Sequence, residues 1–105
     1  MDVLFNLIKQ EIETTSIKLF MKGTKEMPMC GYSNTVVQVL KHYGKDFSTT
    51  NVLEDPAIRV KLSEYSNWPT IPQLFVNGEF IGGCDIVVEL HQKDELKTIL
   101  DQAKK

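Results

Sequence analysis

The sequence predicts an α/β domain in which helices flank a small mixed sheet of four strands. Three observations support this prediction: apolar residues recur at helical spacing in several segments, the first half follows a strand–helix–strand order, and Asn77-Gly78 separates two apolar runs in the second half. The chain has 105 residues, of which 42% are hydrophobic and 25% charged, a composition typical of a globular domain. We therefore expect residues 1–105 to fold as one domain with a modest core.

The first half of the chain carries signals for two helices and two strands. Leu4, Ile8 and Ile12 recur every four residues, which predicts an amphipathic helix that ends near residues 14–15. Gly44 is a typical stop signal for a later helix. The elements expected after the first helix are an apolar strand over 16–23, a helix over 33–44 and a strand over 47–52.

The second half begins with a clear helix start, because Asp55 can cap a helix whose first residue is Pro56. We expect this helix to continue through about Ser66. Residues 72–83 then contain the hairpin with its two-residue turn. Two helices follow in the prediction: residues 84–92, with Asp85 at the start, and a last helix that is capped by Asp94 and runs through Ala103.

This order of elements predicts how the sheet is connected. A right-handed βαβ unit supplies two parallel strands, and the hairpin adds an antiparallel pair, so helices can cover both faces of a mixed sheet. The arrangement is that of the thioredoxin fold, in which a Cys-x-x-Cys motif accompanies a βαβ unit. Here the motif is half present, because Cys30 is followed by Ser33 at the second position.

Charge and composition exclude several classes of function. A net charge of −2 and a sequence pI near 5.6 provide no basic surface for nucleic acid or an anionic membrane. Residues 2–13 place an acid where a signal peptide has basic residues, so no secretory or transmembrane segment is expected. Two widely separated cysteines suggest reactive thiols in a reducing compartment. We expect a cytoplasmic protein, or one in an organelle matrix after removal of a transit peptide.

Cys30 is the first candidate for chemistry. It lies between a predicted strand and the first turn of a predicted helix, where free amide groups and the helix dipole favour a thiolate. With Lys22 across a short loop, we expect a partly exposed thiol with a lowered pKa. The alternative is a buried cysteine that only fills space. Ser33 can bond a backbone group in the first helical turn but cannot resolve a mixed disulfide, so Cys30 would need an external thiol or a more distant cysteine.

Four motifs carry a resemblance to a known family. KGT, CGYS, WPTIP and GGCD occur in this order over residues 22–85, and together they resemble the monothiol glutaredoxins of the CGFS class. The resemblance covers nearly the whole chain. Its main departure is Tyr32, where the class usually has phenylalanine, and a phenol adds a donor and an acceptor beside the thiolate.

The resemblance implies glutathione binding around these motifs. A cis peptide before Pro72 would expose the backbone of Thr70 and Ile71 for pairing with an extended tripeptide, whereas a trans proline would only begin a strand. At the last motif, amides near a helix N-terminus could hold one glutathione carboxylate. The Asp85 side chain could pair with the ammonium group of glutathione, or it could act only as a helix cap. The residues assigned to that end of the site are Gly83, Cys84 and Asp85.

Two basic residues match family positions that contact the other glutathione carboxylate. These are Lys22 and Arg59, although a lone arginine on a helix more often belongs to a solvated face. Cys84 has two interpretations, since it is either structural or a distant thiol that pairs with Cys30 on oxidation. His42 and His91 lack ligand-like spacing with either cysteine, and we expect both to be exposed on helices.

Two functions follow from these assignments. A 2Fe-2S cluster commonly takes four thiolates, and two chains with one Cys30 each plus two glutathiones supply four. The resemblance implies such a carrier, monomeric as the apo form and a homodimer with the cluster, with BolA-like proteins and iron-sulfur apoproteins as partners. The alternative is an enzyme that removes glutathione from protein mixed disulfides, which Cys30 and a glutathione site permit. We expect that activity to be weak, because the loop over 22–30 resembles the extended loop of the class. An adaptor with an inert cysteine would leave the motifs unexplained.

Overall fold

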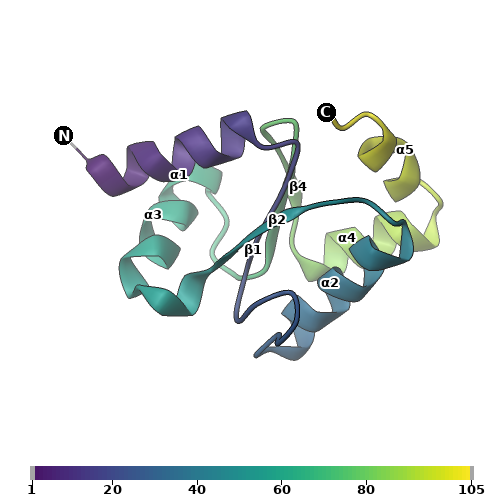
Figure 1. Ribbon diagram of the computed structural model, residues 1–105, viewed down its shortest axis with the longest axis horizontal. Coiled ribbons are helices and arrows are strands. Elements are labelled where there is room, and N and C mark those ends of the chain that lie inside the picture. Colours follow the sequence, from purple (N-terminus) through teal and green to yellow (C-terminus); the bar gives the residue numbers. More distant parts are fainter. Residues whose placement is uncertain (1, 105) are drawn as a thin grey trace.

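The structure is a computed structural model that describes residues 2–104. Helices lie on both faces of a sheet (Figure 1), with α1 and α3 on one side and α2 and α4 on the other. The elements in chain order are α1 (Val3–Thr14), β1 (Ile17–Met21), α2 (Gly31–His42), β2 (Ser48–Asn51), the 3₁₀ turn η1 (Val52–Glu54), α3 (Pro56–Ser66), β3 (Gln73–Val76), β4 (Glu79–Gly82), α4 (Cys84–Gln92) and α5 (Leu96–Asp101).

The sheet has the predicted mixed topology. Its four strands follow the order β2-β1-β3-β4. β1 and β2 are parallel, with Lys18 opposite Ser48, as expected for a βαβ unit. β3 runs antiparallel to β1. β4 runs antiparallel to β3, and the tight turn that joins them has positive φ at both Asn77 and Gly78. The predicted four-stranded mixed sheet is confirmed.

Side chains of β1 alternate between two cores. Ile17, Leu19 and Met21 pack against α2, α4 and α5, whereas Phe20 points to the opposite face, where α1 and α3 lie. This alternation follows from the period of two of an extended strand. Both faces of β1 are covered, which explains why the strand reads as an almost continuous apolar run.

Several predicted helix boundaries agree with the structure, and others differ. Asp55 caps α3 as predicted, since its side chain accepts a hydrogen bond from the amide of Ala57 at 3.0 Å. The predicted cap at Asp94 is wrong. Its φ of 60° is left-handed, and its amide bonds the carbonyl of His91, so Asp94 closes the C-terminus of α4. The last helix ends at Asp101, before the predicted Ala103.

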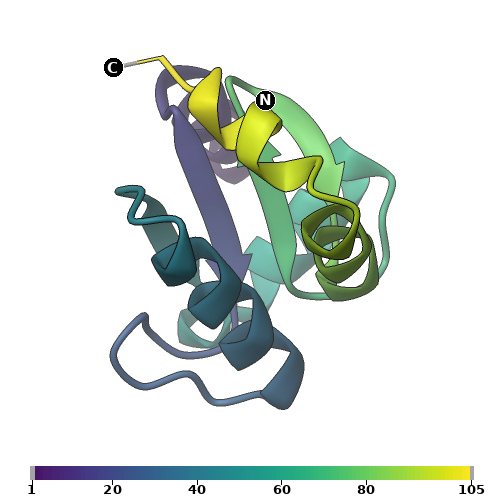
Figure 2. The same ribbon diagram turned by 90° about the vertical axis from the view of Figure 1, so that its right-hand side faces the viewer.

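The loop over residues 22–30 and the beginning of α2 lie at the end of the molecule opposite α5 (Figure 2). α2 begins at Gly31, two residues before the predicted start at Ser33. The loop that precedes β3 and the junction of β4 with α4 approach the same end (Figure 1). The motifs singled out in the sequence therefore come together at the end of the molecule opposite α5.

Candidate functional site

The loop after β1 is closed by its own backbone. The amide of Met29 donates to the carbonyl of Lys22 at 2.9 Å, and Gly23 pairs with Pro28. Gly23 has a φ of 90°, and a side chain there would meet the carbonyl oxygen of Met27 at 2.4 Å, so only glycine fits. This closed loop places Cys30 at the start of α2.

Cys30 occupies the N-cap position of α2 with extended backbone, and its side chain is half-buried. The pKa of its thiol is lowered from 9.0, first because the amide of Ser33 donates to the sulfur, and then by the amide of Tyr32 and the charge of Lys22; partial burial opposes these effects. The predicted partial exposure is confirmed, and the direction of the pKa shift is the predicted one. The space-filling alternative does not account for a half-exposed, stabilised thiolate.

Ser33 is fully buried, and its hydroxyl accepts a hydrogen bond from the amide of Lys22 at 3.1 Å. Its partner is therefore the preceding loop and not, as predicted, a group in the first turn of its own helix. The reason is that the loop folds back over the start of α2 and leaves the Lys22 amide pointing at the hydroxyl. Ser33 thus ties the loop to the helix that carries Cys30.

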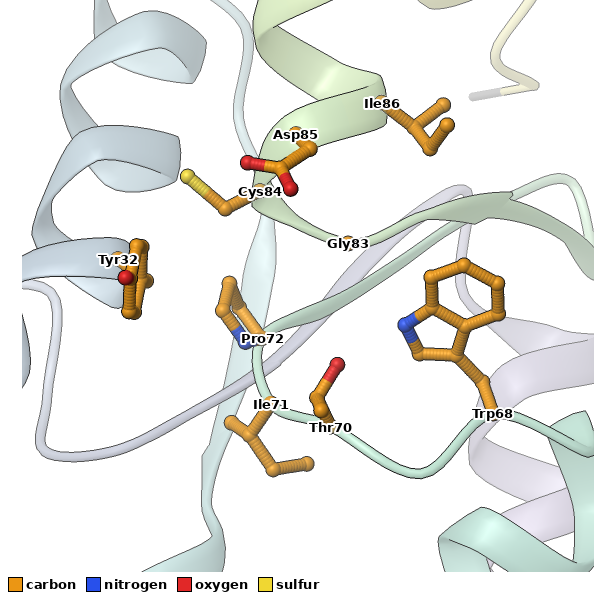
Figure 3. Close-up of a pocket in the computed structure, with 9 residues that line it drawn as sticks. All are labelled: Tyr32, Trp68, Thr70, Ile71, Pro72, Gly83, Cys84, Asp85 and Ile86. Atoms are coloured by element: carbon orange, nitrogen blue, oxygen red, sulfur yellow. The ribbon is translucent and has the colours of Figure 1, made fainter.

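A cavity of about 290 Å³ lies beside this helix start (Figure 3). Three segments line it: the start of α2, the loop before β3 and the junction of β4 with α4. Figure 3 shows Tyr32 and Trp68 on opposite sides of the cavity. The lining residues are Tyr32, Trp68, Thr70, Ile71, Pro72, Gly83, Cys84, Asp85 and Ile86.

The segment before β3 forms one wall of the cavity. The peptide bond between Ile71 and Pro72 is cis, as predicted. Gln73 is fully buried, and its amide nitrogen donates to the carbonyls of Trp68 at 3.0 Å and Thr70 at 3.1 Å. These bonds hold the wall in place from behind, while Thr70 remains exposed.

The start of α4 forms the facing wall. Gly83 is the N-cap residue and supplies no side-chain cap, so the first amides of α4 have no such partner. Asp85 lies in the first turn and is exposed, which makes its predicted role as the cap wrong. A side chain at Gly83 would lie 3.2 Å from the indole nitrogen of Trp68 and 3.3 Å from the carbonyl oxygen of Pro72. Glycine therefore permits the close approach of the two walls.

Cys84 is a half-buried free thiol at the first position of α4. Burial raises its pKa above 9.0, and the charges of Asp85 and Cys30 add to this effect. Cys30 and Cys84 thus have opposite pKa shifts, and the structure assigns the stabilised thiolate to Cys30. Cys84 remains a thiol at neutral pH and is the weaker nucleophile.

The two predicted basic residues are not among those that line the cavity. Lys22 lies in the closed loop, close enough for its charge to stabilise the Cys30 thiolate. Arg59 is exposed on α3, and within residues 2–104 it forms no ion pair. The structure thus places one basic residue beside the thiol and the other on a helix surface.

Two lining residues were not predicted as site residues. Trp68 belongs to the WPTIP motif, which was the available signal, and its indole nitrogen is buried without a hydrogen-bond partner in the described chain. Ile86 follows the GGCD motif directly, and its side chain covers Gly82. No local pattern marks Ile86, because its place in the wall depends on how α4 packs against β4.

The histidines lie away from this cavity. His42 is exposed as predicted, but His91 is half-buried, because its Nδ1 lies 2.5 Å from the hydroxyl of Tyr43 on α2. Within residues 2–104 no three His, Cys, Asp or Glu side chains are grouped so that they could hold a metal ion. No helix of that part of the chain is long and apolar enough to cross a membrane.

Comparison with known sequences identifies relatives over most of the chain. A family model described as glutaredoxin matches residues 17–81. An uncharacterized monothiol glutaredoxin, ycf64-like, of Synechocystis is 54% identical over 96 residues, which cover 91% of this chain and 90% of that protein. The chloroplastic monothiol glutaredoxin-S14 of Arabidopsis thaliana is 47% identical over 100 residues, 95% of this chain and 58% of that protein.

Comparison with solved structures gives the same result. The solution structure of reduced poplar apo GrxS14 is 45% identical with a TM-score of 0.83 and covers 94% of this chain and 91% of that chain. The crystal structure of a buckwheat glutaredoxin–glutathione complex is 25% identical with a TM-score of 0.84, over 94% of this chain and 88% of that chain. The predicted thioredoxin-like fold is confirmed.

Proposed function

Because this chain belongs to the glutaredoxin family, as a monothiol member, we propose that it binds glutathione and carries a 2Fe-2S cluster as cargo between two copies of itself. The observation that carries the proposal is a half-exposed Cys30 with a lowered pKa; Cys30 does not itself line the cavity of about 290 Å³, but Tyr32, two residues further along the chain, does. A thiolate is the form of cysteine that binds iron.

Glutathione is proposed to lie between the two walls of the cavity. The first amides of α4 have no side-chain cap, so they are available for one carboxylate of glutathione. The exposed Asp85 can pair with the ammonium group of glutathione. Backbone groups of Thr70 and Ile71 would pair with the tripeptide. The similar buckwheat protein was crystallised with glutathione, which supports this ligand class. Lys22 and Arg59 are the proposed contacts of the second carboxylate.

The cluster requires more than one chain, because its four ligands are commonly thiolates. No grouping of three metal-ligating side chains exists among residues 2–104, so these residues of one chain do not supply the set. Two Cys30 thiolates and two glutathione thiolates complete the set. The cluster-bound form is therefore proposed to be a homodimer and the apo form a monomer, with BolA-like proteins and iron-sulfur apoproteins as exchange partners.

Anaerobic reconstitution with iron, sulfide and glutathione tests this function. Wild type and Cys84→Ser should develop visible charge-transfer bands and elute as dimers, while Cys30→Ser should stay colourless because it lacks the iron ligand. Asp85→Ala should assemble less cluster because it holds glutathione less well. Equal assembly by wild type with and without glutathione, or a colourless but folded Cys84→Ser, would contradict the proposal.

A second function is favoured by the same lowered pKa. The Cys30 thiolate can attack the glutathione sulfur of a protein mixed disulfide, so that the protein thiolate leaves and Cys30 carries glutathione. A second glutathione thiolate then attacks that sulfur, which releases glutathione disulfide and restores Cys30. Release of the free thiol from a glutathionylated peptide in the presence of excess glutathione measures this activity. Rapid turnover by a chain that binds no cluster would make this the main function.

The compartment is proposed to be the cytosol or an organelle matrix. A reduced Cys30 is needed for either chemistry, and both compartments keep thiols reduced. The chloroplastic location of the Arabidopsis relative supports the second alternative. Fractionation of source cells followed by immunodetection distinguishes the two, and detection of the protein only in a secreted fraction would contradict both.

A further inference from the structure

Two exposed methionines precede Cys30 in the sequence. The side chains of Met27 and Met29 are 72% and 70% exposed, whereas methionine is ordinarily among the more buried residues. Tyr32, on the other side of the thiol, is 64% exposed. Together Met27, Met29 and Tyr32 form the part of the surface that we call the thiol rim.

The backbone fixes both methionines in the rim. The amide of Met29 donates to the carbonyl of Lys22 at 2.9 Å, and the amide of Met27 donates to the hydroxyl of Thr24 at 3.0 Å. The carbonyl of Met27 in turn accepts from the amide of Thr24 at 3.1 Å. These bonds hold the loop backbone in the conformation in which both methionines are exposed to solvent.

Met21 provides a reference within the same protein. It lies at the end of β1 and is fully buried in the core between the sheet and α2. Its thioether is chemically the same as those of Met27 and Met29. An oxidant in solution can therefore reach the two rim methionines in the folded chain but reaches Met21 only after unfolding.

We propose that Met27 and Met29 are oxidation sites and that their sulfoxides regulate the face that carries Cys30. The oxidant is a peroxide. Each thioether sulfur attacks one peroxide oxygen, a sulfur–oxygen bond forms as the oxygen–oxygen bond breaks, and water leaves after proton transfer. Sulfur loses the two electrons that the peroxide gains. The apolar thioether becomes a polar sulfoxide, which a methionine sulfoxide reductase can reverse.

The regulatory part rests on the proposed function, because a cluster held by Cys30 of two copies brings their thiol rims together. Met29 directly precedes Cys30, and the Cα of Met27 can lie no more than about 11 Å from that of Cys30. Contact between the rims would remove the thioethers of both copies from water. A buried sulfoxide loses its bonds to water, so oxidation is expected to weaken the cluster-bound dimer about tenfold.

The first experiment measures the order of oxidation. The folded Cys30→Ser, Cys84→Ser double variant is treated with hydrogen peroxide, and sulfoxide at each methionine is followed by peptide mass spectrometry. Met27 and Met29 should be oxidised on the order of tenfold faster than Met21. In urea, which exposes Met21, the difference should disappear. Equal rates in the folded variant would overturn the assignment.

The second experiment measures the dimer. Wild-type thiols are blocked as mixed disulfides with glutathione, the methionines are oxidised with hydrogen peroxide, and dithiothreitol then frees the thiols but leaves sulfoxides intact. Treated and untreated samples are reconstituted with iron, sulfide and glutathione, and dimer formation is followed by gel filtration against protein concentration. The Met27→Leu, Met29→Leu double variant should be insensitive to peroxide, because leucine is apolar and lacks sulfur.

The outcomes separate this proposal from the proposed function. An untreated chain that forms no cluster-bound dimer would refute the proposed function, and the regulatory part with it. If the untreated chain assembles and the oxidised chain assembles equally well, only the regulatory part is wrong. Loss of assembly in the treated leucine variant would also overturn it, since the damage would then lie outside Met27 and Met29.

Discussion

Replacing Lys18 by methionine is expected to raise the free energy of unfolding, although it removes an ion pair. The Lys18 side chain is 3% exposed, and its Nζ lies 3.4 Å from the hydroxyl of Ser48 and 3.8 Å from a carboxylate oxygen of Glu11. Burial lowers the pKa of Lys18 from 10.5, and the opposing attraction of Glu11 is the smaller effect. The folded protein therefore holds this charge less favourably than water does.

The size of the gain follows from what the substitution removes. Exchange of a buried ionic group for an apolar side chain of similar volume ranges from neutral to stabilising by about 4 kcal/mol. The Glu11 side chain is 52% exposed, so it returns to water without a buried, unpaired charge. The weak contacts with Ser48 and Glu11 are lost, which places the expected gain near 1 kcal/mol at pH 7. In a domain of this size the melting temperature should rise by roughly 4 °C.

Urea unfolding, followed through the fluorescence of the single tryptophan, measures this difference. Between the folded pKa of Lys18 and 10.5 the unfolded chain binds more protons than the native chain, so wild-type stability rises with pH in that window. The advantage of Lys18→Met should thus be complete at pH 7 and shrink as the pH approaches 10.5. Lys9→Met, at an exposed position of α1, is the control and should stay within about 0.5 kcal/mol of wild type. A Lys18→Met variant that is less stable than wild type by about 1 kcal/mol would refute the reasoning, because the ion pair would then outweigh desolvation.

Three further measurements test the site and one surface ion pair. Titration of the thiolate absorbance of Cys30 in a Cys84→Ser background should give a pKa below 9.0, because amide hydrogen bonds stabilise the anion; a value at or above 9.0 would contradict the activated thiol. Gly83→Ala should weaken glutathione binding about tenfold, because its methyl group would lie 3.2 Å from the indole nitrogen. Tryptophan fluorescence quenching measures that affinity, and unchanged binding would mean that the indole moves aside. NMR titration should place the carboxyl pKa of Asp101 at about 2, because Lys45 and, to a smaller extent, Lys97 hydrogen-bond to it; Lys45→Met should move the pKa toward 3.8, and an unchanged value would rule out a contribution from that lysine.

Local signals predicted most of the fold, because they act through short stretches of backbone. Asp55 followed by Pro56 begins a helix wherever the surrounding chain permits, and both residues do so here. The Asn77-Gly78 pair accepts the positive φ values that a tight hairpin needs. Cys30 lies at a helix start because the helix that carries the apolar residues Val36, Val37 and Leu40 begins directly after it, and the lowered pKa of its thiol follows from that position. None of these features depends on a distant part of the chain.

Other features depended on contacts between segments far apart in the sequence. Lys18 is a charged residue in a strand, and it is buried because helices cover both faces of β1. Asp94 resembles a helix cap, yet the chain uses its left-handed backbone to end α4. Trp68 and Ile86 line the cavity because α4 packs close to the loop before β3. Sequence alone thus determined the type and order of the elements and several of their first residues, since those preferences are local. Tertiary structure decided which side chains lose contact with water and which meet at the cavity, because burial and proximity arise only when the elements pack together.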